Sequence, residues 1–242
     1  MTQAVNGLSA LVRLRDEETW CRLAIESIVD WCDEVIVVLN RPSDATPDIV
    51  ANLASVHRGK IRVYEHNHET WPMGPNHDAI SADDPRSSAA LYNFTASKAT
   101  RTHGVKIDGD MIMMDWAGAE IRRLMDKGRD RIRFEGVDIV GDELKHVGCH
   151  PTCRTNGVYR LAGTHYLQGA MTQSLRGVPD AEDAFGKPAF LHFKWARKSF
   201  ASATAQWPQG WEEMPHFQNI AARRHPVAPY RGEYPASVRA LL

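Results

Sequence analysis

Two carboxylates separated by one glycine, Asp108-Gly109-Asp110, form the part of this sequence with the clearest potential for chemistry. They directly follow Val105–Ile107, a short segment that we expect to form a strand. In open α/β sheets ligands bind beyond the carboxyl ends of the strands, so two oxygen ligands are expected at that edge. Such close carboxylates raise each other's pKa unless a cation joins them, and Mg²⁺ or Mn²⁺ suits them. The tripeptide is also common in surface turns, so alone it leaves both interpretations open.

The elements that must position this pair alternate between strand-like and helix-like patterns. The predicted strands are 7–14, 34–39, 60–64 and 105–107, and the predicted helices are 17–32, a segment that begins at Thr46-Pro47, and 87–102. This order predicts an α/β fold with a mostly parallel central sheet flanked by helices. A polar loop rich in histidine and proline, 66–86, interrupts the alternation, and loops of this length are usually functional or disordered.

The second half of the chain has a weaker pattern. It predicts a helix over 116–127, strands over 131–140 and 190–195, and a helix over 196–205. From Lys194 to the end there are seven basic residues against three acidic ones, a net charge of +4. We therefore expect a mildly basic arm on an acidic body, and this arm is a candidate for peripheral contact with a membrane.

Composition excludes several classes of protein. The 242 residues are 43% hydrophobic and 24% charged, which is typical of a soluble globular protein. The net charge of −1 provides no overall positive field for nucleic acid. The longest stretch without a charged side chain has 15 residues, fewer than the roughly 20 that a membrane span needs. Four cysteines and the absence of a secretory signal pattern predict a cytoplasmic protein without a disulfide framework.

Four segments stand in an order that matches a known family. They are ALVRLRDE (10–17), DEVIVVLNRPSDAT (33–46), YNFTASKATRTHGVKIDGD (92–110) and HFKW (192–195). Together they resemble the family 2 glycosyltransferases of the GT-A fold, and HFKW resembles an element of a bacterial polysaccharide-type branch. Asn40 stands where that family usually has an acid after its second strand, and an asparagine can still hydrogen-bond a nucleobase or ribose.

The resemblance implies a GT-A-type nucleotide-diphospho-sugar transferase. The activity would be metal-dependent transfer of a sugar from a nucleotide-sugar donor to a glycan, a lipid-linked glycan or another hydroxyl acceptor, with inversion. Residues 1–205 would form the catalytic domain, with a nucleotide-binding half over 1–115 and an acceptor half over 116–205. Residues 206–242 would form a C-terminal extension.

The resemblance also implies roles for individual residues. Asp110 would hold Mn²⁺ or Mg²⁺, which neutralises the departing diphosphate, while Asp108 assists or contacts the ribose. His192 is either a third metal ligand or a histidine packed in a strand. The implied nucleotide-sugar-binding residues are Arg15, Glu17, Asn40, Asp44, Lys106, Asp108 and Lys194.

An inverting transfer needs a general base, which in this family lies in an acidic element after the metal pair. The best match is PDAED over 179–183, where Asp183 is favoured and Glu182 and Asp180 come next. Asp138 and Asp142 are further candidates. The same stretch is equally consistent with a solvated acidic loop.

Other interpretations remain for some segments. His146, Cys149, His150 and Cys153 could bind zinc, although their spacing lacks the paired CxxC pattern of structural zinc sites. The histidines of the long loop, His66, His68 and His77, either line a substrate loop or face water. A sugar-nucleotide nucleotidyltransferase would need a glycine-rich loop after the first strand, where VRLRDEE has none. A nucleotide-sugar-binding relative without catalysis is the non-enzymatic alternative.

Overall fold

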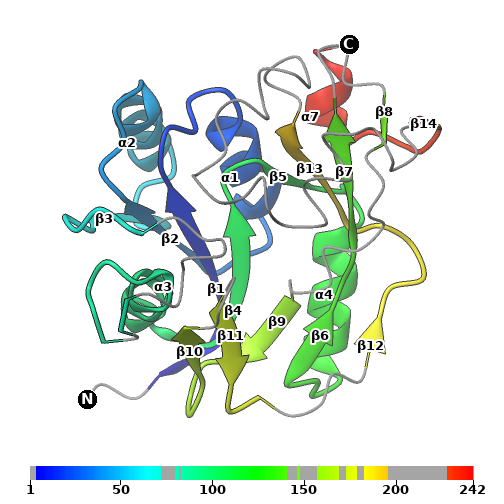
Figure 1. Cartoon of the computed structure of the whole chain (residues 1–242). Coiled ribbons are helices and arrows are strands. Elements are labelled where there is room, and N and C mark those ends of the chain that lie inside the picture. The colour runs from blue at the N-terminus through cyan, green and yellow to red at the C-terminus, as the bar shows by residue number, and fades with distance from the viewer. Residues whose placement is uncertain are drawn as a thin grey trace.

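The structure is a computed structural model of the chain. It describes residues 4–71, 80–81, 83–140, 146–147, 157–168, 173–178, 183–195 and 228–241. These residues form a seven-stranded sheet, a five-stranded sheet and a two-stranded hairpin, with helices packed around the larger sheet (Figure 1). The predicted α/β class with a mostly parallel central sheet is confirmed.

The centre of the larger sheet is built by the first half of the chain. Four parallel strands stand in the order β4-β1-β2-β3, with the bounds Arg101–Asp108, Val5–Leu14, Glu34–Leu39 and Ile61–Glu65. Every residue of β2 is buried, because helices cover both faces of this part of the sheet. The parallel order brings the carboxyl ends of β1, β2 and β4 to one edge.

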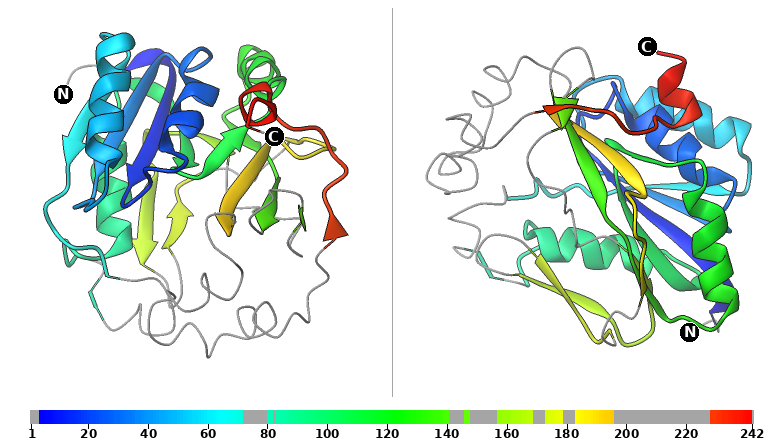
Figure 2. Two further views of the ribbon diagram at one scale, coloured as in Figure 1. Left: turned by 90° about the horizontal axis from the view of Figure 1, so that it is seen from above. Right: turned by 90° about the vertical axis from the view of Figure 1, so that its right-hand side faces the viewer.

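Three helices cover these strands, and they divide between the two faces (Figure 2). Helices α1 (Cys21–Val29) and α2 (Thr46–Val56) pack against one set of alternate strand residues, and α3 (Ser88–Ser97) packs against the other. Helix α1 is shorter than the predicted 17–32. The predicted helix 87–102 was too long, because residues 101 and 102 pair with β1 as part of β4.

Later segments extend the larger sheet and build the smaller one. Strands β9 (Gly157–Arg160), β6 (Arg131–Arg133) and β12 (Asp183–Ala184) continue outward from β4, and helix α4 spans Ala117–Asp126. The second sheet has the order β14-β8-β7-β13-β5, with the bounds Ala228–Pro229, His146–Val147, Gly136–Val140, Phe190–Trp195 and Met111–Met113. The hairpin joins β10 (His165–Gln168) to β11 (Gln173–Arg176).

The predicted single strand over 131–140 is wrong, because β6 and β7 belong to different sheets. Between them Phe134 is fully buried, and a side chain at Gly136 would collide with the ring of Phe190. The chain therefore leaves the larger sheet at this point and enters the smaller one.

The end of the chain returns to the body of the protein. Strand β14 pairs with β8, and Val238 of the short helix α7 (Ala236–Arg239) is buried in the main core. The predicted helix 196–205 and much of the predicted extension lie outside the described residues. Within the described parts of the chain, no helix has the length and apolar character needed to cross a membrane.

Candidate functional site

The Asp108-Gly109-Asp110 turn lies at the carboxyl edge of the larger sheet, where β4 ends and β5 begins. A Cβ added to Gly109 would lie 2.5 Å from Leu14 Cδ2 and 2.8 Å from Glu17 Cγ. Only glycine therefore allows this turn to approach the end of β1 so closely. The acidic pair stands beside the loop that follows β1.

Asp108 is held by two cations. Arg13 Nη2 lies 2.8 Å from its Oδ1, and Lys106 Nζ lies 3.0 Å from its Oδ2. Burial alone would raise the pKa of Asp108, but the charges of Lys106 and Arg13 hold that pKa well below its usual range. The neighbouring carboxylate does not raise the pKa of Asp108, because cations of the protein itself neutralise it, which is the exception stated for close carboxylates.

Asp110 faces a different partner, His192 of β13. Strand β13 is antiparallel to β5 and parallel to β7, which places His192 opposite Met111 on one side and opposite Asp138 on the other. His192 Nε2 lies 3.2 Å from Asp110 Oδ1, and His192 Nδ1 lies 2.8 Å from Asp138 Oδ1. Burial lowers the pKa of His192, but the two carboxylates outweigh it and raise that pKa well above its usual value. The three side chains form one hydrogen-bonded line.

This line has features that suit a divalent cation. A metal-bound histidine usually directs its second ring nitrogen at a carboxylate, as His192 directs Nδ1 at Asp138. The other nitrogen, Nε2, faces Asp110 and would bind the metal after losing its proton. Asp110 and His192, each less than 10% exposed, then offer one oxygen and one nitrogen. Among the described residues no group of three or more His, Cys, Asp or Glu side chains could hold a metal by itself. Two protein ligands nevertheless suit an ion such as Mn²⁺ or Mg²⁺, because such an ion keeps its other positions open for substrate phosphates.

The loops after β1 and β2 are joined by hydrogen bonds. The Asp16 carboxylate accepts from the backbone N–H of Ser43 at 2.6 Å, and the Asp44 carboxylate accepts from the backbone N–H of Glu18 and of Thr46, both at 2.9 Å. The backbone of Asp16 has a φ of +52°, which few residues other than glycine adopt. Asp44, predicted to bind the nucleotide sugar, thus uses its carboxylate to fix the two loops.

Two further predicted residues, Asn40 and Arg15, stand at this edge. Asn40 is buried, and its side-chain amide donates to the backbone carbonyls of His66 at 3.1 Å and His68 at 2.7 Å. Arg15 is exposed and forms an ion pair with Glu69 at 2.9 Å. Asn40 therefore anchors the segment after β3, and of the predicted loop histidines His66 is buried whereas His68 is exposed.

The structure does not bring every predicted residue to this edge. Asp183 lies in β12, at the far edge of the larger sheet and three strands from β4 (Figure 1), roughly 14 Å across the sheet at the usual strand spacing. Lys194 lies in β13, two residues after His192. Other predicted positions are outside the described residues, namely His77, Asp142, Cys149, His150, Cys153, Asp180 and Glu182, as are the side chains of His146, Asp183 and Lys194. Their roles stay predictions.

The sequence pattern did not predict a role for Arg13. Its side chain is 6% exposed, and its guanidinium carbon lies 4.0 Å from the centre of the Tyr92 ring. A charged residue within the apolar strand that ends at Leu14 was the available signal, because a buried charge needs a partner.

The role of Asn93 was missed as well. Its side chain pairs with the backbone of Tyr166 in β10, accepting from the N–H at 2.7 Å and donating to the carbonyl at 2.9 Å. The Tyr92-Asn93 pair, which carried part of the family resemblance, therefore stacks against Arg13 with one residue and holds the hairpin with the other.

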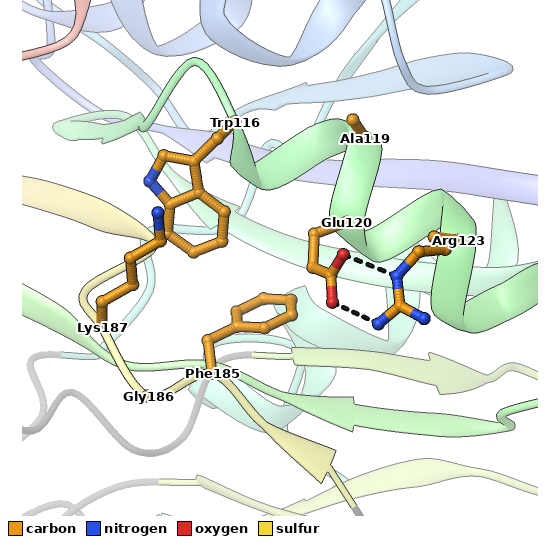
Figure 3. Close-up of a pocket in the computed structure, with 7 residues that line it drawn as sticks. All are labelled: Trp116, Ala119, Glu120, Arg123, Phe185, Gly186 and Lys187. Carbon is orange, nitrogen blue, oxygen red and sulfur yellow. Dashed lines mark hydrogen bonds and ion pairs between the residues drawn. The ribbon is translucent and has the colours of Figure 1, made fainter.

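A separate hollow of about 500 Å³ lies beside α4, and none of the predicted site residues lines it. Its lining consists of Trp116, Ala119, Glu120, Arg123, Phe185, Gly186 and Lys187 (Figure 3). Lys187 Nζ lies 4.1 Å from the centre of the Trp116 ring, and Phe185 meets the same ring edge-on. Asp110 lies directly before β5, whereas Trp116 comes after it. The hollow is therefore next to the carboxyl end of β5, and the acidic turn is next to its amino end.

Comparison with known proteins gives similarity in structure only. No protein-family model matches this chain, and no curated protein matches it in sequence. Three crystal structures of residues 1–349 of S. aureus TarS are similar. For the structure without a named ligand the TM-score is 0.54 at 14% identity, and the match covers 78% of this chain and 60% of the TarS chain. For the complex with UDP-GlcNAc the TM-score is 0.53 at 14% identity, with 89% of this chain and 66% of the TarS chain covered. For the complex with UDP it is 0.53 at 13% identity, with 90% of this chain and 70% of the TarS chain covered.

This chain thus spans less than two thirds of the first two TarS structures. At 13–14% identity the similarity establishes the fold alone. The chain has the GT-A fold of the nucleotide-sugar transferases, which its four sequence landmarks predicted.

Proposed function

We propose that this protein is a metal-dependent glycosyltransferase that transfers a sugar from a nucleotide-diphosphate donor to a hydroxyl acceptor. The observation that carries the proposal is the Asp110–His192–Asp138 line beside the Asp108-Gly109-Asp110 turn, at the carboxyl edge of a GT-A sheet. TarS has been crystallised with UDP and with UDP-GlcNAc, which supports a uridine diphosphate sugar as the first donor to test.

Each residue of the line has a separate task in this proposal. Asp110 and His192 bind the divalent cation, and Asp138 orients the His192 ring through Nδ1. When bound, the cation stabilises the negative charge that develops on the departing diphosphate. Arg15 and Glu17 follow β1 at the same edge, and Asn40 keeps the segment after β3 in place there.

The acceptor side of the reaction rests on the sequence resemblance. We propose a glycan acceptor, inversion at the transferred sugar, and Asp183 as general base with Glu182 as the alternative. An Asp183→Asn variant should retain donor binding and lose about 10²-fold or more in transfer, the usual effect of removing a general base. The position of β12 at the far sheet edge counts against this role, and an Asp183→Asn variant with normal transfer would remove it.

We also propose that the protein works in the cytoplasm at the inner face of the membrane, with its basic C-terminal arm directed to anionic lipids. The net charge of +4 from Lys194 onward supports this proposal. Sedimentation with anionic vesicles at low salt should carry the protein into the pellet, and neutral vesicles should not. Equal recovery with both kinds of vesicle would contradict it.

Donor binding can be tested by isothermal titration of UDP and of UDP-, GDP- and CMP-sugars, with and without Mn²⁺. We expect Mn²⁺ to tighten binding of one nucleotide series, and Asp110→Asn to abolish that enhancement. Asp126→Asn, which changes an exposed aspartate at the end of α4, is the matched control. Binding that is independent of metal in the wild type would refute the site. Metal-dependent binding without transfer or donor hydrolysis would instead favour a nucleotide-sugar-binding protein.

A further inference from the structure

The two acidic residues of the Asp108-Gly109-Asp110 turn stand in opposite electrostatic surroundings. Asp110 faces a histidine that is itself bound to a second carboxylate, Asp138. Asp108 instead faces two full positive charges, one on each of its oxygens. The surroundings of Asp110 attract a divalent cation. The two positive charges beside Asp108 already exceed the single negative charge of its carboxylate.

The two cations lie behind Asp108 rather than in front of it. The side chains of Arg13 and Lys106 are 6% and 11% exposed, and that of Asp108 is 30% exposed. Both cations also lie over the Tyr92 ring, Arg13 at 4.0 Å and Lys106 at 5.5 Å from its centre. The carboxylate therefore forms the accessible surface of a cluster whose positive charges are fixed underneath.

We propose that Arg13, together with Lys106, is a positioning residue that holds Asp108 as a hydrogen-bond acceptor for the donor and keeps it from acting as a metal ligand. This inference rests on the proposed function and extends it. Arg13 and Lys106 each occupy one lone pair of the carboxylate, and the lone pairs that remain can accept from hydroxyl groups. The divalent cation is thereby left to Asp110 and His192.

The charges of this cluster make the inference testable. Removing the positive charge of Arg13 exposes the charge of Asp108, so the affinity for Mn²⁺ in the absence of nucleotide should rise by about three- to tenfold. Nucleotide affinity should fall in the same variant, because the carboxylate is no longer held. A purely structural role for Arg13 would weaken both kinds of binding together.

The experiment measures Mn²⁺ binding by electron paramagnetic resonance and UDP binding by titration in Arg13→Gln, Arg13→Lys, Asp108→Asn and the double variant Arg13→Gln/Asp108→Asn. We expect Arg13→Gln to bind Mn²⁺ more tightly, Arg13→Lys to resemble the wild type, and Asp108→Asn to bind it about three- to tenfold more weakly. The double variant restores the wild-type charge, so its Mn²⁺ affinity should return to within about twofold of the wild type.

The double variant separates charge from coordination. If Asp108 were a metal ligand, restoring the charge would not replace the lost oxygen, so the double variant would bind Mn²⁺ clearly more weakly than the wild type, beyond the twofold range expected here; that result would overturn the inference while leaving the proposed function intact. Weaker Mn²⁺ binding by Arg13→Gln would also overturn it. A wild-type protein that binds neither Mn²⁺ nor UDP overturns the proposed function and this inference with it. If Arg13→Gln does not fold, Lys106→Met removes the second cation of the cluster and carries the same expectations.

Discussion

Asp138 has no direct place in the chemistry proposed for this site, yet its removal should weaken metal binding. Its Oδ1 lies 2.8 Å from His192 Nδ1 and is the contact that turns Nε2 toward Asp110. A hydrogen bond to a charged group contributes about 1.5–3 kcal/mol, which corresponds to about 10–100-fold in affinity. The Asp138 side chain is 22% exposed, and water replaces part of the lost contact. We therefore expect Asp138→Ala to weaken Mn²⁺ binding by about tenfold, the lower end of the range for such supporting residues.

The assay titrates Mn²⁺ into the wild type, Asp138→Ala and Asp138→Asn, with thermal unfolding measured alongside. The asparagine keeps an oxygen that can accept from His192 Nδ1 but removes the charge, so Asp138→Asn should lie between the other two proteins. The exposed Asp126→Asn change controls for the loss of one acidic charge far from the line. If folded Asp138→Ala binds Mn²⁺ as tightly as the wild type, Asp138 does not orient His192 for a metal and the reasoning is refuted.

Three further predictions concern the scaffold of the site. Glu34 is buried at the start of β2, where burial would raise its pKa but hydrogen bonds and the charge of Arg62 lower that pKa below the usual 4.5. Glu34→Gln should cost about 2–3 kcal/mol of unfolding free energy at neutral pH, and the difference measured by urea denaturation should shrink as the pH falls below about 4.5. A difference independent of pH would contradict the assignment. Gly109→Ala should lower stability by about 1–3 kcal/mol and weaken binding of Mn²⁺ with UDP, whereas unchanged affinity would show that the turn tolerates a side chain. Asn93→Ala removes both hydrogen bonds to the backbone of Tyr166, so hydrogen exchange should speed up in the β10–β11 hairpin, and unaltered protection there would count against this anchor.

The local order of residue types was sufficient to predict those helices and strands whose burial is reflected directly in the sequence. The run Glu34–Leu39 predicted β2 with both of its ends, because a strand covered on both faces must be apolar throughout. Proline at the start of α2 marked its first turn. The helix predicted over 87–102 ended too late, because spacing alone does not record that residues 101 and 102 find hydrogen-bond partners in β1.

The acidic pair was also visible without a structure, since carboxylates that directly follow a buried strand of an α/β sheet lie at its ligand-binding edge. The family resemblance implied different roles for the two residues, but the difference in their surroundings was not visible in the sequence. Spacing treats Asp108 and Asp110 alike, whereas packing gives one of them two buried cations and the other a histidine.

What the sequence determined by itself is therefore the order of strands and helices, the edge at which ligands gather and the landmarks that predicted a GT-A fold. Each of these depends on residues close together in the chain. The tertiary structure decided which distant side chains meet, because the register of β13 between β5 and β7 joins Asp110, Asp138 and His192 across more than 80 positions. That register is set by hydrogen-bonded pairing within the five-stranded sheet between strands far apart in the chain, and the spacing of residues within one strand does not name its partners.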